Sequence, residues 1–172
     1  MFRPCPGFSA VLALSLLAIF APLPAFAAQS TGSSEAVVVR PLTLVAVRPL
    51  SFGNLIAGAT PGTATVDEYT EARTVTGGVT QAGGTISAAR FTGLTSGNSH
   101  LKIDIPNGSI TLTHTNGTTT MTADTFELNG DKNDWVGPNE VFEFQVGARL
   151  LVGANQLPGT YTGTFDVTVT YR

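Results

Sequence analysis

The stretch of sequence that decides the fold is Leu101-Lys-Ile-Asp-Ile-Pro-Asn-Gly-Ser-Ile-Thr-Leu-Thr113. Apolar and polar side chains alternate on both sides of Asn107-Gly108, and a period of two places every second side chain on one face of a strand. Asn-Gly is also the dipeptide most favoured in two-residue hairpin turns. The stretch therefore predicts two half-buried antiparallel strands, 101–105 and 110–112, joined by a tight turn.

The same pattern extends outward in both directions along the chain. Downstream, a second two-residue turn is expected at Asn116-Gly117, and upstream a polar turn separates paired strands. A single helical turn fits 67–73, although no apolar face supports it. The remaining strands are expected at 42–47, 49–53, 54–58, 63–66, 73–76, 85–91, 121–128, 142–146 and 161–171. Short alternating strands with regular turns predict an all-β fold, an immunoglobulin-like antiparallel β-sandwich.

Composition supports this class and excludes several others. The chain contains 25 threonines, 19 glycines and 10 phenylalanines, which suit pleated strands and the turns between them. A hydrophobic content of 42% with 12% charged residues excludes a disordered chain. A net charge of −3 without a basic run argues against nucleic-acid binding. One cysteine excludes a disulfide or zinc scaffold, so the fold must rest on burial of its core.

The N-terminus has the layout of a secretory signal peptide. Arg3 precedes an apolar stretch over 8–20, and Ala25-Phe26-Ala27 matches a signal-peptidase site. The stretch is shorter than the roughly 20 apolar residues that span a bilayer. We therefore expect a signal peptide over 1–27, an N-terminal extension over 28–41 and one β-sandwich domain over 42–172, in an exported protein.

The sequence offers little chemistry, and no enzyme activity or cofactor is expected. Neither His100 nor His114 belongs to a nucleophile elbow or a zinc-protease motif, so both are expected as surface strand residues. The oxygen-rich stretch 129–134 lacks the ligand spacing of a calcium loop and is expected to be a polar turn. Trp135 either caps an edge of the core or stacks on a sugar ring.

The C-terminal strand lacks an expected neighbour. Alternation over 161–171 places its apolar side chains on one face, and the given sequence ends one residue later at Arg172. A seven-stranded sandwich would cover that face with one further strand. Gly159, fourteenth from the end, and the penultimate Tyr171 resemble the C-terminal signature of chaperone–usher pilus subunits. The residues expected to form a subunit or chaperone groove are Gly159, Tyr161, Phe165, Val167, Val169, Tyr171 and Arg172.

A wider resemblance covers nearly the whole chain after the signal peptide. It rests on Pro49-Leu-Ser-Phe-Gly53, Thr76-Gly-Gly-Val79, Gly84-Thr-Ile-Ser-Ala-Ala89, Val146-Gly-Ala148, Leu151-Val-Gly-Ala154 and Pro158-Gly-Thr-Tyr-Thr-Gly-Thr-Phe165. These motifs are similar to the bacterial "domain of unknown function 4402" family. That resemblance implies a secreted β-domain of Gram-negative bacteria and fixes no biochemical activity. Its link to pilin-like and spore-coat-U-like domains is a fold-level analogy.

The pilin resemblance implies a sandwich that is completed in trans. A periplasmic chaperone, and later the extension of a neighbouring subunit, would supply the missing strand, with an outer-membrane usher guiding assembly at the cell surface. The candidate donor strand comprises Ala36, Val37, Val38 and Val39. The expected function is then a structural fimbrial or coat subunit that self-associates into a polymer. The alternative is a secreted monomeric carbohydrate- or matrix-binding module with its ligand surface near Trp135.

Overall fold

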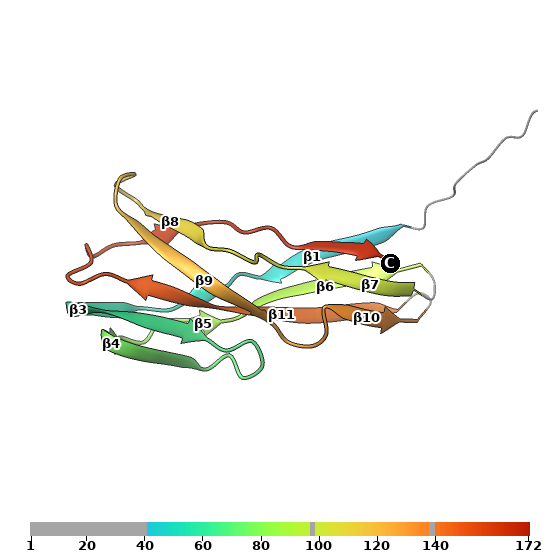
Figure 1. The fold of residues 1–172 in the computed structure, drawn as a ribbon, viewed down its shortest axis with the longest axis horizontal. Coiled ribbons are helices and arrows are strands. Elements are labelled where there is room, and N and C mark those ends of the chain that lie inside the picture. The colour runs from blue at the N-terminus through green and yellow to red at the C-terminus, as the bar shows by residue number, and fades with distance from the viewer. Residues whose placement is uncertain (1–40, 97–98, 138–139) are drawn as a thin grey trace, which may run out of the picture. The chain divides into compact units, whose positions relative to one another are not determined.

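The computed structural model describes residues 41–96, 99–137 and 140–172, and within these ranges every paired strand is antiparallel (Figure 1). Nothing helical in these ranges is long or apolar enough to span a bilayer. The predicted all-β, sandwich-like class is thus confirmed. The signal peptide expected over 1–27 and the candidate donor residues lie outside the described residues.

The described residues form thirteen strands, with connections that contain only turns and irregular segments. The strands are β1 (Leu42–Arg48), β2 (Ser51–Phe52), β3 (Leu55–Val66), β4 (Arg73–Gln81), β5 (Ile86–Ser87), β6 (Ala89–Thr95), β7 (Ser99–Asp104), β8 (Ile110–His114), β9 (Thr120–Leu128), β10 (Asn133–Val136), β11 (Val141–Val152), β12 (Tyr161–Thr162) and β13 (Thr168–Tyr171).

Strand β11 is the central strand of the larger sheet, whose order is β1-β6-β11-β9-β8-β12. Its first half pairs with β6, and its second half lies between β9 and β3, which also pairs with β4. Three further strands form a second sheet in the order β10-β7-β13, and β2 pairs with β5. The core lies where these sheets face one another.

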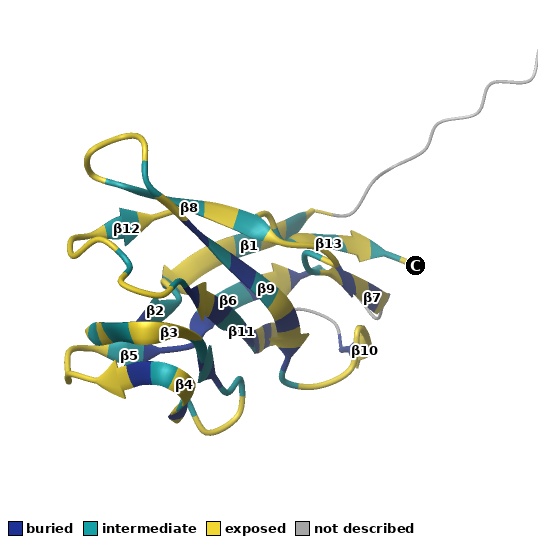
Figure 2. Cartoon of the chain, turned by 60° about the vertical axis from the view of Figure 1, so that its left-hand side comes forward, coloured by how far each residue is buried: buried dark blue, intermediate teal, exposed yellow. Residues whose placement is uncertain are grey.

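Alternation along β11 and β9 accounts for most of that core (Figure 2). Buried apolar side chains recur at every second position of β11, as the sequence predicts for 142–146, and the pattern continues to Val152. Leu101 of β7 and Val146 of β11 have no exposed surface. Each such side chain contributes about 1.5–3 kcal/mol when fully buried. Core burial of this kind stabilises the domain without disulfides.

The turn predicted at Asn107-Gly108 connects two sheets and does not close a hairpin. Strand β7 pairs with β10 and β13, whereas β8 pairs with β9 and β12. The expectation of a two-residue hairpin there is therefore wrong. Alternation fixes which face of a strand is buried, and it does not specify the partner strand, so the same local pattern fits a crossover.

The second Asn-Gly step is a hairpin, but with a longer loop than predicted. His114 N–H donates to Thr119 O at 2.8 Å, which leaves four residues in the loop between β8 and β9. Asn116 Oδ1 accepts from the backbone N–H groups of Thr118 and Thr119, at 3.0 and 3.1 Å. The asparagine side chain thus replaces backbone bonds that a two-residue turn would make.

Strands β3 and β4 extend through several glycines, beyond the shorter strands expected at 54–58, 63–66 and 73–76. The expected pairing of 63–66 with 73–76 is present, and pairing resumes beyond a bulge in β3 between Ala57 and Gly62. A Cβ atom on Gly62 would lie 2.1 Å from Thr76 O. Glycine therefore permits a close approach of two backbones, and it does not end the strands.

Between β3 and β4 the chain makes one α-turn. Glu71 N–H donates to Asp67 O at 3.0 Å, and Asp67 Oδ1 accepts from Tyr69 N at 3.0 Å and Thr70 N at 2.7 Å. The hydrogen bond from Thr70 holds the pKa of the Asp67 carboxyl below its usual range. The single turn expected over 67–73 is therefore real, but it does not continue into a helix.

An ion pair joins β9 to β11 on the outer face of the large sheet. Arg149 donates to Asp124 in a two-pronged contact, with Nε–Oδ1 at 2.8 Å and Nη2–Oδ2 at 3.0 Å. This hydrogen bonding lowers the pKa of Asp124 below its ordinary value. A lowered native pKa stabilises the fold above the unfolded pKa of about 3.9, and the stabilisation is lost as pH falls through the native pKa.

We expect Asp124→Asn to lower the free energy of unfolding at pH 7 by about 0.5–1 kcal/mol, since both side chains are partly exposed and screened by solvent. Below pH 4, the free energy of unfolding of the variant should also fall less steeply with pH than that of the parent protein. Urea unfolding at pH 7, 4 and 3 measures both effects. Asp166→Asn, at an exposed position, is the control and should keep the parent's pH dependence. An equally steep decline in Asp124→Asn would contradict the assignment.

Candidate functional site: an apolar groove

The C-terminal segment is paired at its two ends and unpaired in the middle. Strand β12 pairs with β8 and β13 with β7, which belong to different sheets. Residues 163–167 cross between them with no strand assignment. The single continuous strand expected over 161–171 is therefore wrong, because one strand cannot stay in both sheets.

The predicted facing of this segment is nevertheless present. Its apolar side chains are partly buried against the core, and the threonine and aspartate side chains between them are exposed. The partly buried residues are Tyr161, Phe165, Val167, Val169 and Tyr171. One face of the segment therefore packs inward even where its backbone lacks a ladder partner.

A groove of about 920 Å³ lies between this segment and the β1–β2 region. Ala46, Leu50 and Phe52 contribute to one wall, and Tyr161 and Phe165 to the other. Its floor is apolar and comes from four strands, β6, β8, β9 and β11. The floor residues are Phe91, Ile110, Leu112, Met121, Ala123, Leu150 and Val152. A core-like surface thus lines an open groove.

Beyond one end of the groove, the C-terminal segment contacts the start of β1. The Tyr171 hydroxyl donates to Pro41 O at 3.0 Å, just before β1 begins. From that end β1 and the C-terminal segment run alongside each other in opposite directions (Figures 1 and 2). In the part of the chain that is described, β1 pairs only with β6. Its other edge is the one available to a further strand.

Phe165 holds the unpaired segment against the core. Its ring lies 5.2 Å from the ring of Phe126 and 6.2 Å, edge-on, from that of Phe91. Phe91 in turn stacks on Phe144 at 5.3 Å. Aromatic pairs at these separations add about 0.5–1.5 kcal/mol each beyond their burial. Within the unpaired segment, these ring contacts pack Phe165 onto the core.

Gly159 and His114 shape the opposite end of the groove. His114 Nδ1 accepts from Asn116 N–H at 2.9 Å, so Nε2 carries the proton and donates to Pro158 O at 3.1 Å. The imidazole also meets the Tyr161 ring edge-on at 4.8 Å. Gly159 has φ +148°, and a Cβ there would lie 1.9 Å from Nε2. This contact explains the glycine, and it gives His114 an anchoring role that its sequence context does not indicate.

The seven residues predicted to form the groove lie in three places. Val167, Val169 and Tyr171 pack on the core beyond the cavity, and Gly159, Tyr161 and Phe165 line it. Arg172 lies away from the groove. Its backbone N–H donates to His100 O at 2.9 Å, and its guanidinium to Asn133 Oδ1 at 3.2 Å.

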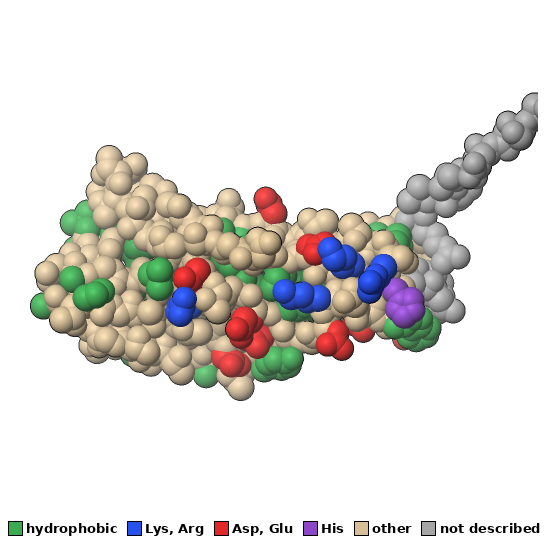
Figure 3. All heavy atoms as spheres, viewed as in Figure 1, with side chains coloured by type: hydrophobic (Ala, Val, Ile, Leu, Met, Phe, Trp, Pro, Cys, Tyr) green, Lys and Arg blue, Asp and Glu red, His purple; other side chains and the backbone are tan. Residues whose placement is uncertain are grey.

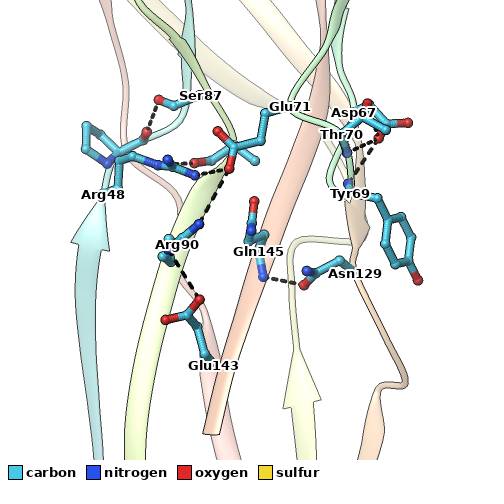
Figure 4. A network of polar contacts seen from close by, with 12 residues as sticks. Arg48, Asp67, Tyr69, Thr70, Glu71, Ser87, Arg90, Asn129, Glu143 and Gln145 are labelled. Atoms are coloured by element: carbon cyan, nitrogen blue, oxygen red, sulfur yellow. Dashed lines mark hydrogen bonds and ion pairs between the residues drawn. The ribbon is translucent and has the colours of Figure 1, made fainter.

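A network of charged side chains lies on the outer face of the large sheet (Figure 4). Glu71 bonds to Arg48 and lies 3.7 Å from Arg90, which also pairs with Glu143 at 3.4 Å. With its amide nitrogen toward Glu71, Gln145 donates to that carboxylate at 2.9 Å and accepts from Arg90 at 3.3 Å. These contacts fasten the β3–β4 turn to β1, β6 and β11. The network is therefore a structural element.

The oxygen-rich stretch after β9 forms hydrogen bonds that involve backbone N–H groups. Asn129 Oδ1 accepts from Gln145 N–H, and Gly130 N–H donates to the Tyr69 hydroxyl at 2.9 Å. The stretch therefore ties β9 to β11 and to the β3–β4 turn. The side chain of Trp135, just beyond it, is 57% exposed on β10.

Comparison with known proteins gives one match. A family model described as "Domain of unknown function (DUF4402)" matches residues 42–171, from the first residue of β1 to the last of β13. No curated protein and no solved structure matches the chain.

Proposed function

The chain belongs to the DUF4402 family, and from the groove that its domain leaves open we propose that it is a structural subunit of a bacterial surface appendage or coat that assembles by β-strand complementation. The observation that carries the proposal is the apolar groove between β1 and the unpaired residues 163–167. The protein would be exported, held in the periplasm by a chaperone and passed through an usher to the cell surface.

Strand addition suits this groove for two physical reasons. The free edge of β1 and the backbone of residues 163–167 offer donors and acceptors to an inserted strand, and the apolar floor accepts alternate side chains. Fully burying Val37 and Val39 of a donor strand would contribute roughly 3–6 kcal/mol, at about 1.5–3 kcal/mol each. That is a substantial part of the roughly 5–15 kcal/mol that stabilise a typical domain. An unfilled groove would leave a subunit prone to aggregate through its edge.

The proposed donor is the segment 36–39 of a second copy. If the chain folded back on itself through a two-residue turn at Arg40-Pro41, Val39 would face Leu42 and Glu35 would reach the level of Ala46. A carboxylate would then enter an apolar groove. Proline also fixes φ near −65°, whereas the favoured hairpin turns need positive φ values. Donation from another copy needs no turn at Pro41. It also leaves the register of the donor strand free, so that Glu35 can lie outside the groove.

We expect surface-sheared protein to run as a ladder on an unheated SDS gel and to collapse to one band on boiling. Val37→Asp combined with Val39→Asp should abolish the ladder, because a charged donor face cannot enter the groove. Ser33→Asp adds charge to the same extension outside the donor and should leave the ladder intact. A single monomer band in both lanes, from soluble and stable protein, would contradict assembly.

A secreted monomeric carbohydrate- or matrix-binding module is the second candidate. The exposed indole of Trp135 favours it, since tryptophan is usually buried. That function predicts a stable monomer on the same gel.

A further inference from the structure

The outward face of the small sheet brings Trp135, His100 and Arg172 into one row. Trp135 of β10 is directly opposite His100 of β7, whose carbonyl accepts from Arg172 N–H at 2.9 Å on the other side. Leu101 is fully buried, so its neighbour His100 points away from the core. Residues directly opposite one another share a face of the sheet, so all three side chains project to the outside.

The cation in this row is free for a ligand. The guanidinium of Arg172 reaches across β7 to Asn133 Oδ1 at 3.2 Å, which holds it beside the row, two residues before Trp135 on the same strand. The neighbouring cation, Lys102, is already paired with Asp104 at 2.7 Å. Among the ion pairs of the described residues, none involves Arg172. Figure 3 shows Lys and Arg side chains and a histidine gathered beside a hydrophobic side chain at this end of the domain.

We infer that this row binds an acidic saccharide, a pyranose that carries a carboxylate. The indole of Trp135 offers a flat apolar surface for the C–H face of the sugar, and the guanidinium offers a two-pronged partner for the carboxylate. Between them His100 and Asn133 can bond hydroxyl groups. The guanidinium bonds to Asn133, and Trp135 lies two residues further along the same strand, about 7 Å away, a span that a sugar ring and its carboxylate fill.

The shape of the face favours a polymer over a small molecule. Small ligands need an enclosed pocket, whereas an open strand face suits an extended chain that lies along it. One exposed ion pair contributes little, so a single site binds weakly. Many copies on one surface would bind strongly through avidity. The inference rests on the second candidate function, a carbohydrate-binding module, and does not depend on strand exchange, because the row lies on β7, β10 and Arg172.

The chain's single tryptophan makes the test direct, since its fluorescence reports on this row alone. Titration of the purified protein with tetragalacturonate should give a saturable shift of the emission, and neutral cellotetraose should give a much smaller one. We expect Arg172→Gln to raise the apparent Kd at least fivefold. Lys132→Gln removes an equal charge from the same end of the domain outside the row and should change the Kd less than twofold.

Four results would overturn the inference. Three of them are no change of the emission with tetragalacturonate at 10 mM, an equal response to cellotetraose, and equal weakening of binding by the two variants. Penta-glutamate matching the uronate would indicate an acidic-peptide site instead. Circular dichroism of each variant verifies that the fold is intact.

Discussion

Gly93→Ala is expected to lower the free energy of unfolding by about 3 kcal/mol, the upper end of the usual cost of overpacking a core. Gly93 is buried in β6, between β1 and β11. A Cβ atom there would lie 2.1 Å from the Phe142 ring and 2.4 Å from Thr43 O. The ring could move only into the packed core, and the carbonyl belongs to the backbone of β1. The added methyl group therefore pushes β6, which contributes to the floor of the groove, away from β1, which contributes to one wall.

Gly108→Ala is the matched control for this prediction. A Cβ at Gly108 would meet no atom within 4 Å, so the same chemical change should alter stability by less than about 0.5 kcal/mol. Urea unfolding of both variants, followed by circular dichroism, gives the comparison. Equal free energies of unfolding for the two variants would contradict the prediction, because they would show that β6 accommodates a methyl group at position 93.

Much of the fold can be predicted from the sequence because side-chain alternation is local. The pattern over 142–146 identifies the core face of β11, and the pairing of 63–66 with 73–76 follows from the polar turn between them. Partner choice is not local. Asn107-Gly108 has the signature of a hairpin, yet β7 and β8 lie in different sheets, and only long-range packing decides that.

The candidate site was predictable in part for the same reason. Alternation indicates the inward face of the C-terminal segment and therefore Phe165 as a wall residue. It cannot indicate that the segment leaves both sheets at 163–167, because that break depends on which strands its two ends join. The contact of Gly159 with His114 joins residues 45 positions apart, and no local sequence pattern predicts it.

The features that the sequence predicts and those that it misses differ for one physical reason. Residues whose environment is set by strand period, such as Leu101 and Phe144, are buried as the sequence predicts. Residues whose role depends on the meeting of distant segments, such as His114 and Arg172, acquire that role only in the fold. The groove belongs to the second kind, because its walls come from opposite ends of the domain.

Phe165→Ala is expected to lower the free energy of unfolding by about 3 kcal/mol, the lower end of the range for Phe→Ala, because Phe165 is only partly buried. The variant loses ring contacts with Phe91 and Phe126 and leaves a void between them. Residues 163–167 have no ladder partner to compensate, so the wall of the groove should detach as well.

Two measurements distinguish the loss of stability from the detachment of residues 163–167 from the core. Urea unfolding gives the free energy, and limited proteolysis should show faster cleavage within 163–167. Thr164→Ala, at the exposed neighbouring position, is the control and should change neither by a measurable amount. If the Phe165→Ala variant stays within 1 kcal/mol of the parent and resists the protease, the segment is held by its paired ends at β12 and β13. The groove would then have a rigid wall before any strand enters, and the proposed assembly would not need a donor to order it.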